Sequence, residues 1–365
     1  MKVKLLVIDD SAFMRTAVRL MVKNDPDIEV VGEARDGLSG IQMVEALNPH
    51  VVTMDVEMPV MNGLEATRII MERFPRPIIM LSSMTERGSE TTVKALAAGA
   101  VDFIPKKSSY VQLDIVQIGN ELHDKIRYWG ERYLQVSCGF LKNDARGTPL
   151  KLPVDRTAGN RPELVVIGAS TGGPAQLPNL MVGMGQLTCP VVIAQHMPLL
   201  FTAGFAKHLK TFSGLNVLLA SDGMELKPGM VAICPGGTDT IVRESLPGRF
   251  VTCVRKYPDI PIHPSVDLLF DSAARLKGSS VGVIMTGMGS DGTQGAQALA
   301  DRGNRVLVQE LRECIVDGMP SSAIASGVVH EVLTVDGIGR RLKKWAGTGT
   351  GSLLNNMETE KRTRK

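Results

Sequence analysis

Short apolar runs alternate with amphipathic segments through the first third of the chain. Between the apolar runs, hydrophobic residues recur at helical spacing, for example at Phe13, Ala17 and Leu20. Alternating strands and helices joined by short connections predict a doubly wound α/β domain around a parallel sheet over residues 1–129. The five predicted strands are Lys4–Asp9, Ile28–Ala34, Val51–Asp55, Pro77–Leu81 and Ala100–Ile104.

The same alternation returns over residues 163–345 after an interval without periodicity. Gly and Pro interrupt residues 130–162, which are predicted to form a linker between two domains. The second domain is predicted to be a mainly parallel α/β fold with one β-hairpin. Residues 346–365 are rich in Gly and Thr and then in charge, and are predicted to be a disordered tail. The predicted parallel strands are Leu164–Ile167, Pro190–Gln195, Asn216–Ala220, Met230–Cys234, Val281–Met285 and Arg305–Gln309, and the hairpin pairs Thr240–Arg243 with Phe250–Val254.

Length and composition narrow the class of protein. The 365 residues are 44% hydrophobic and 22% charged, with a net charge of +3 at pH 7, which suits two globular domains. The basic residues form no long run, so nucleic acid is not expected as a partner. No apolar run approaches the roughly 20 residues of a membrane span and no export signal precedes the first strand. The five cysteines lie far apart, as reduced thiols would. We therefore expect a cytoplasmic protein with no membrane insertion.

Charged and hydroxyl side chains gather where the strands of the first domain end. These residues are Asp9, Asp10, Asp55, Ser82 and Lys106. The carboxyl ends of parallel strands meet at one edge of the sheet, where three carboxylates would repel one another unless a cation neutralised them. A set of oxygen ligands suits Mg²⁺. Each residue taken alone could cap a helix or carry a solvated charge, but their conjunction indicates a site.

These positions resemble the receiver domain of two-component response regulators over the full length of the first domain, and the resemblance implies a flavodoxin-like fold with five parallel strands. The resemblance rests on residues 54–59 (Met-Asp-Val-Glu-Met-Pro), 80–83 (Met-Leu-Ser-Ser) and 103–106 (Phe-Ile-Pro-Lys). It implies that a histidine kinase phosphorylates Asp55, a reaction that depends on positioning and charge neutralisation. The implied Mg²⁺ ligands are Asp9, Asp10, Asp55 and the backbone carbonyl of Glu57, and the implied phosphoryl-sensing residues are Ser82 and Lys106.

A turn of small residues follows the strand that opens the second domain. Residues 168–173 read Gly-Ala-Ser-Thr-Gly-Gly, so Ser170 lies where a strand gives way to a helix. A dinucleotide-binding fingerprint would need a glycine in place of Ser170, and a P-loop would need a lysine in place of Pro174. Residues 168–172 do fit the Gly-x-Ser-x-Gly turn that exposes a nucleophilic serine. They also fit a helix N-cap without chemistry, so the partners of Ser170 must decide.

A serine nucleophile needs a base, usually a histidine that a carboxylate orients. His196 differs from the other five histidines because it follows a buried strand almost directly and leaves the sheet at the same edge as Ser170. Asp291 lies in the glycine-rich turn 286–292 after the strand Val281–Met285, and it reaches this edge as well. The alternative role for Asp291 is to cap the helix that follows it.

Four segments of the second domain, behind a receiver domain, are similar to those of the chemotaxis protein-glutamate methylesterase family. They are residues 168–173, 195–198 (Gln-His-Met-Pro), 264–267 (Pro-Ser-Val-Asp) and 286–292 (Thr-Gly-Met-Gly-Ser-Asp-Gly). The similarity covers nearly the whole chain outside the predicted linker and tail.

The resemblance implies a phosphorylation-activated serine hydrolase with a Ser170–His196–Asp291 triad. Its substrates would be glutamate γ-methyl esters on chemoreceptors, with deamidation of receptor glutamines as a second activity, and its role would be adaptation in chemotaxis signalling. Backbone N–H groups of Thr171 and Met288 would stabilise the oxyanion. No cofactor is expected for the esterase half.

Two positions depart from the usual pattern of this family, Asp239 and the pair 310–311 (Glu-Leu), and neither is expected to touch the triad. The alternatives to an esterase are a DNA-binding response regulator and a nucleotide-dependent oxidoreductase. The sequence lacks a basic recognition helix for the first and a Gly-x-Gly-x-x-Gly turn for the second. From the domain order, we expect the unphosphorylated receiver to cover the cleft around Ser170 and phosphorylation of Asp55 to release it.

Overall fold

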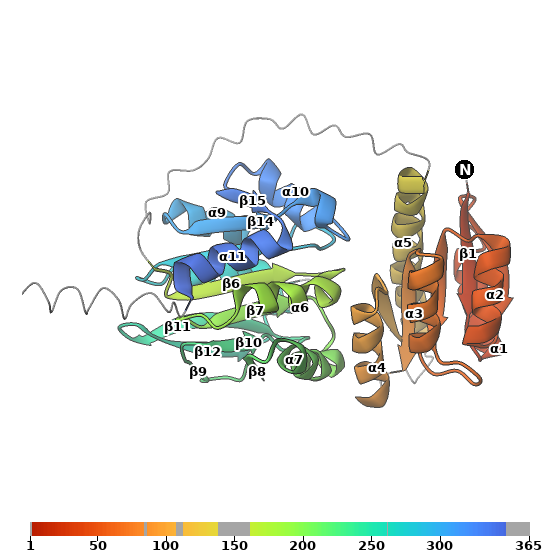
Figure 1. Ribbon diagram of the computed structural model, residues 1–365, viewed down its shortest axis with the longest axis horizontal. Coiled ribbons are helices and arrows are strands. Elements are labelled where there is room, and N and C mark those ends of the chain that lie inside the picture. The colour runs from red at the N-terminus through yellow and green to blue at the C-terminus, as the bar shows by residue number, and fades with distance from the viewer. Residues whose placement is uncertain (1, 84–85, 107–111, 138–160, 261, 348–365) are drawn as a thin grey trace, which may run out of the picture.

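The computed structural model describes residues 2–83, 86–106, 112–137, 161–260 and 262–347. It contains two α/β domains, each built around its own parallel sheet (Figure 1). The predicted linker residues 138–160 and tail residues 348–365 lie outside the described ranges. Within those ranges, no helix combines the length and the apolar character needed to cross a bilayer.

The first domain is a five-stranded parallel sheet in the order β2-β1-β3-β4-β5. The strands are β1 (Val3–Ile8), β2 (Ile28–Ala34), β3 (Val51–Asp55), β4 (Ile78–Ser83) and β5 (Asp102–Lys106). The helices are α1 (Ala12–Val22), α2 (Gly37–Leu47), α3 (Gly63–Arg73), α4 (Glu86–Ala97) and α5 (Gln112–Ser137). This order and the strand–helix alternation confirm the predicted flavodoxin-like fold.

Alternate residues of β1 pack into two cores on opposite faces of this sheet. Leu6 and Ile8 belong to the core beneath α2 and α3. Leu5 and Val7 belong to the core beneath α1 and α5. Because the side-chain period of a strand is two, helices cover both faces, and the strands read as continuous apolar runs.

Polar caps begin three of the receiver helices. The side chains of Ser11, Asp36 and Asn62 each accept a hydrogen bond from the backbone N–H three residues later. Such caps satisfy N–H groups that have no partner inside the helix. Helices α1 and α2 start within a few residues of the preceding strand ends, at the carboxyl edge of the sheet.

The second domain contains a seven-stranded parallel sheet in the order β15-β14-β13-β6-β7-β10-β8 and a separate antiparallel sheet, β11-β12-β9. The strands are β6 (Leu164–Ala169), β7 (Val191–Gln195), β8 (Asn216–Leu219), β9 (Glu225–Leu226), β10 (Met230–Ile233), β11 (Asp239–Leu246), β12 (Arg249–Arg255), β13 (Ser280–Ile284), β14 (Arg305–Gln309) and β15 (Glu331–Leu333). The helices are α6 (Gly173–Met184), α7 (Leu199–Ser213), α8 (Val266–Ala274), α9 (Thr293–Asp301), α10 (Gly318–Ala325) and α11 (Val335–Ala346), with a short 3₁₀ turn at Leu311–Glu313. The predicted parallel fold and its hairpin are confirmed.

Two predicted boundaries differ from the structure. Helix α5 continues to Ser137, so residues 130–137 of the predicted linker are helical. Helix α11 continues to Ala346, which is 1% exposed, and Gly347 bridges to Leu187. The predicted tail therefore starts inside the folded domain. Strands β9 and β15 were not predicted, because two or three residues are too few to show a hydrophobic period.

The two domains contact each other through α4 of the first domain and α6 and α7 of the second (Figure 1), and two residues of β5 add further contacts. The rings of Phe103 and Phe201 lie 4.7 Å apart between centroids. The Thr171 hydroxyl donates to Oδ2 of Asp102 at 3.2 Å. Val316 is buried in the core cluster that also contains receiver residues of β1 and α5. The receiver thus touches the residue that directly follows Ser170.

We predict that deletion of residues 348–365 leaves thermal stability unchanged, whereas deletion of residues 346–365 lowers it. The longer deletion removes the Ala346 carbonyl, which accepts from both the backbone N–H and the hydroxyl of Thr188. Because Thr188 is exposed, water can bind the freed donors, and each lost hydrogen bond should cost about 0.5–1.5 kcal/mol. Calorimetric melting of the two truncated chains beside the full chain measures this, and equal melting temperatures for both truncations would show that the Ala346 contacts contribute nothing.

Candidate functional site

Ser170 lies in a tight turn between β6 and α6. Its backbone N–H donates to the Thr286 carbonyl, and its own carbonyl accepts from Gly173. Gly172 adopts φ = 84°, a left-handed conformation that favours glycine, and a Cβ there would lie 2.6 Å from Ile315. The turn is therefore fixed by its backbone, and Ser170 is 8% exposed at the strand's carboxyl end.

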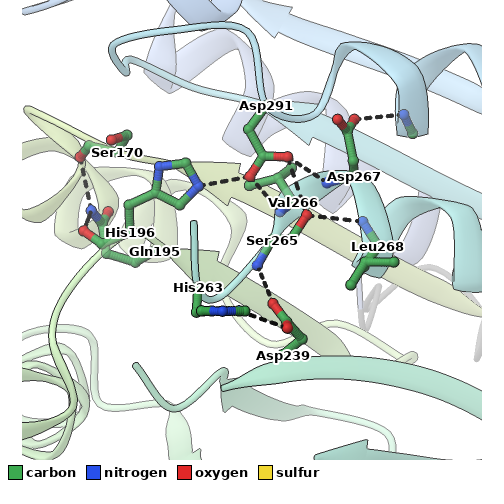
Figure 2. Close-up of polar contacts among 11 residues, drawn as sticks. Ser170, Gln195, His196, Asp239, His263, Ser265, Val266, Asp267, Leu268 and Asp291 are labelled. Carbon is green, nitrogen blue, oxygen red and sulfur yellow. Dashed lines mark hydrogen bonds and ion pairs between the residues drawn. The ribbon is translucent and has the colours of Figure 1, made fainter. Parts of the chain in front are cut away.

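The three strands β13, β6 and β7 are neighbours in the sheet, so their carboxyl ends bring Asp291, Ser170 and His196 to one edge. Nε2 of His196 lies 2.8 Å from Oδ2 of Asp291. Figure 2 shows the His196 ring between Ser170 and Asp291. The structure therefore brings together the three residues that the sequence placed at this edge.

Asp291 is held by the N-terminus of α8. Its carboxylate accepts from the backbone N–H groups of Val266, at 2.8 Å, and Asp267, at 2.9 Å, and from the Ser265 hydroxyl at 3.3 Å (Figure 2). Burial alone would raise the pKa of Asp291, but the hydrogen bond and charge of His196 and these amides outweigh it and lower the pKa. The alternative that Asp291 caps the following helix is wrong, since the N-cap of α9 is Gly292 and has no side-chain cap.

The histidine uses Nε2 for the carboxylate, which leaves Nδ1 as the nitrogen for Ser170. Among the described residues, no hydrogen bond joins the Ser170 hydroxyl to either ring nitrogen. Catalytic hydrogen bonds are often long without substrate and shorten when the substrate binds. Proton transfer from Ser170 thus requires only a closer approach of the hydroxyl to Nδ1.

Two backbone N–H groups beside Ser170 are suited to bind an oxyanion. Within the described ranges, no acceptor is present for the N–H of Thr171 or of Met288. A Cβ at Gly287 would lie 2.7 Å from Cβ of Ser170, so the turn that carries Met288 passes directly beside the serine. The placement agrees with the expected oxyanion role.

Gln195 is a functional residue that the sequence analysis did not single out. It is 1% exposed at the end of β7, and its side-chain amide donates to the backbone carbonyls of Ser170, at 2.8 Å, and His196, at 3.0 Å. It therefore ties the serine turn to the histidine turn. Its position beside His196 in the Gln-His-Met-Pro segment was the signal that could have found it.

A cleft of about 670 Å³ opens beside Asp291. Apolar and acidic side chains line it together. Burial and the charge of Asp291 raise the pKa of Asp267 in this cleft to about 6. The cleft is large enough for several substrate side chains. Its lining includes Ile260, Ile262, Leu268, Met288, Asp267 and Asp271.

The receiver domain gathers its own charged cluster. Carboxylate oxygens of Asp9, Asp10 and Asp55 lie within 4.8 Å of one another. Nζ of Lys106 lies 2.8 Å from both Asp9 and Asp55. Burial and the charge of Asp9 raise the pKa of Asp55 to about 6, against the lowering effect of Lys106. Three close carboxylates with one exposed member suit a partly hydrated Mg²⁺, so the residues fit the ion.

Ser82 and Glu57, the two other predicted site residues of the first domain, lie at the same edge of the sheet as Asp55. Ser82 lies on β4 opposite Pro105 in the strand register, and its side chain lies outside the described part of the structure. Glu57 is exposed in the turn after β3. Both therefore lie at the carboxyl edge of the sheet with Asp55, where the sequence analysis expected them.

The fold and the two sites together define a class. It is a response regulator whose receiver domain precedes an α/β domain that carries serine, histidine and aspartate at one sheet edge.

Comparison with known proteins identifies the family. The family described as response regulator receiver domain matches residues 5–116, and that described as CheB methylesterase matches residues 165–342. A protein-glutamate methylesterase/protein-glutamine glutaminase of Lawsonia intracellularis is 37% identical over 354 residues, which are 93% of this chain and 98% of the relative. A relative of the same name from Geobacillus kaustophilus is 40% identical over 353 residues, 94% and 99% of the two chains. A solved structure of the Thermotoga maritima CheB methylesterase catalytic domain is 37% identical, covers 50% of this chain and 98% of its own, and has a TM-score of 0.48. The chain belongs to the family of CheB methylesterases with a receiver domain.

Asp55 and Asp25 should respond to pH in opposite directions. The raised pKa of Asp55 means that its ionisation destabilises the receiver as pH rises from about 4 to 6. Asp55→Asn should therefore stabilise the receiver by about 1–2 kcal/mol at pH 7, and this gain should shrink as the pH falls from about 6 to below 4. For Asp25, burial opposes ionisation, but the Asp27 amide, His123 and Arg127 outweigh it and lower the pKa.

Asp25→Asn should accordingly destabilise the receiver at pH 7, with the effect shrinking as pH falls through the lowered pKa. Calorimetric melting in EDTA at both pH values measures the two variants side by side. If Asp55→Asn instead destabilised the receiver at pH 7, the raised pKa of Asp55 would be contradicted.

Proposed function

We propose that this protein is a phosphorylation-controlled serine hydrolase that removes γ-methyl esters from glutamates of chemoreceptors and deamidates receptor glutamines. The observation that supports this most strongly is the His196–Asp291 hydrogen bond at the sheet edge beside Ser170. The names of the relatives supply the substrate class. Chemoreceptors are accordingly the proposed substrates, and adaptation in chemotaxis signalling is the proposed role.

The proposed reaction proceeds through an acyl-enzyme. Nδ1 of His196 takes the Ser170 proton as Oγ attacks the ester carbonyl carbon, while Nε2–H remains bonded to Asp291. The N–H groups of Thr171 and Met288 bind the oxyanion, a contribution of about 3–4 kcal/mol for each such donor. The proton on Nδ1 passes to the departing methanol. Water then attacks the acyl group, and the same residues return Ser170 to its hydroxyl form.

In the receiver, Asp55 is the proposed phosphoryl acceptor and a chemotaxis histidine kinase the proposed donor. Asp9, Asp10, Asp55 and the carbonyl of Glu57 would hold Mg²⁺, which supplies charge neutralisation for the transfer. Lys106 contacts Asp55 already and is placed to bind a phosphoryl oxygen, with Ser82 as the proposed second contact.

The cytoplasm is the proposed location. The described cysteines Cys189, Cys234 and Cys253 are free thiols. Burial raises the pKa of both Cys189 and Cys234 to about 12, so these thiols stay protonated and unreactive. Free, buried thiols suit a reducing compartment.

We propose that the unphosphorylated receiver restrains the esterase site. The Thr171–Asp102 hydrogen bond and the Phe103–Phe201 contact support this, because both join β5 to elements beside Ser170. Strand β5 also carries Lys106, whose partner is Asp55. A phosphoryl group on Asp55 that engages Lys106 would therefore act on the same strand that touches Thr171.

We predict that Ser170→Ala abolishes methanol release from membranes that carry methyl-labelled chemoreceptors, because it removes the nucleophile. Asp55 should still be phosphorylated normally, since the receiver site contains no residue of the second domain. Adding His196→Ala to Ser170→Ala should reduce the release no further, because triad members act as a unit. Substantial release by Ser170→Ala would rule out the proposed nucleophile.

A second prediction concerns regulation. A small-molecule phosphodonor with Mg²⁺ should raise methanol release by the wild type, and the fragment 161–365 should exceed the unphosphorylated full chain without any donor. A tenfold activation needs about 1.4 kcal/mol of differential stabilisation, within reach of a few contacts. Asp55→Ala should remain at the basal rate with the donor. A fragment that is slower than the unphosphorylated full chain would show that the receiver activates the site and does not restrain it.

A further inference from the structure

A second carboxylate–imidazole pair lies behind the triad. Asp239, the first residue of β11, is completely buried, and its Oδ2 lies 2.7 Å from Nδ1 of His263 (Figure 2). The same carboxylate accepts from the backbone N–H of Ser265 at 2.8 Å and of Tyr257 at 3.4 Å. These donors span the loop that leads from β12 to α8. A buried carboxylate is stable only with such partners, so Asp239 fixes the path of this loop.

The loop ends at Ser265 and Val266, which both donate hydrogen bonds to Asp291. The Ser265 backbone N–H faces Asp239, whereas its hydroxyl donates to Asp291 at 3.3 Å and caps α8 by accepting from Leu268. The next residue, Val266, donates its N–H to the Asp291 oxygen that also accepts from His196. The chain of contacts from Asp239 through Ser265 to Asp291 is therefore continuous. Asp239 was expected not to touch the triad, and among the described residues it forms no hydrogen bond with Ser170, His196 or Asp291; its connection to Asp291 is indirect, through Ser265.

We propose that Asp239 and His263 are positioning residues for the esterase reaction: they fix Ser265 and the N-terminus of α8 so that its amides aim the Asp291 carboxylate at His196. The proposal rests on the esterase site proposed above. Among the described residues, neither side chain forms a hydrogen bond or ion pair with Ser170, His196 or Asp291, so their effect on the reaction passes through the backbone of α8. Displacements of about 1 Å at such a site can slow the chemistry severalfold to a hundredfold.

The test uses full-length protein and a fluorophosphonate probe that phosphonylates an activated serine. Two quantities are measured separately at saturating probe: the rate constant of Ser170 labelling and the final labelled fraction. The rate constant reports the geometry of the triad, whereas the final fraction reports how much protein is folded. Asp239→Ala should lower the rate constant about tenfold or more with the final fraction unchanged. His263→Leu should lower it by a smaller factor, because the Asp239 carboxylate keeps its two backbone donors.

Asp222→Ala is the matched control. Asp222 accepts a backbone N–H from Val254 of the same antiparallel sheet but is exposed and has no link to α8. It should label at the wild-type rate. The double variant Asp239→Ala/His263→Leu should be no slower than Asp239→Ala alone, since both act through one path.

A wild-type rate constant for Asp239→Ala overturns the proposal, as does an effect confined to the final labelled fraction. Should Asp239→Ala fail to fold, His263→Leu decides, and an unchanged rate constant there overturns it. Failure of the wild type to label at Ser170 would overturn the proposed esterase function itself. The wild-type result therefore distinguishes failure of the esterase proposal from failure of the positioning proposal.

Discussion

The hydrogen bond between His196 and Asp291 depends on a carboxylate that stays ionised in a buried place. Burial opposes that charge, and the N-terminal amides of α8 compensate for it with the His196 ring. An anion at a helix N-terminus gains both unpaired N–H donors and the positive end of the helix dipole. The rest of the esterase site is arranged around this one stabilised charge, since it fixes which ring nitrogen of His196 is left for Ser170.

The site forms at the carboxyl edge of the parallel sheet, and glycines in the turns allow the close packing around it. Neighbouring strands β13, β6 and β7 deliver Asp291, Ser170 and His196 without any long connection. The lack of a side chain at Gly287 lets its turn pass beside Ser170, and the lack of one at Gly172 leaves room for Ile315. Gln195 then links the serine and histidine turns from beneath. The strand order, the glycine turns and the Gln195 hydrogen bonds that stabilise this edge of the sheet therefore also set the relative positions of the three triad residues.

The two parallel sheets and most residues of the two sites could be predicted from the sequence, because its hydrophobic pattern indicates where the strands end. Apolar runs followed by glycine or carboxylate marked the edges of both sheets, and so Asp55, Ser170, His196 and Asp291 could be placed together. The role of α8 could not be predicted, because Val266 and Asp291 are 25 residues apart and only packing brings the helix end to the carboxylate. The same limit hid Asp239, whose link to Asp291 passes through the backbone of Ser265. The continuation of α5 beyond residue 129 was missed because Tyr133 and Leu134 pack against His50 and the core of the first domain, contacts that a local pattern does not show.

The most direct test of this account is the protonation of the His196 ring. In ¹⁵N-histidine-labelled full-length protein at neutral pH, NMR separates protonated from unprotonated ring nitrogens, and comparison with His196→Gln assigns the signals. The hydrogen bond to Asp291 requires a proton on Nε2, and the proposed role of His196 as the base for Ser170 requires a free lone pair on Nδ1. A neutral His196 ring with the proton on Nδ1 and none on Nε2 would contradict the account, because Asp291 would then face a lone pair and Ser170 would have no base.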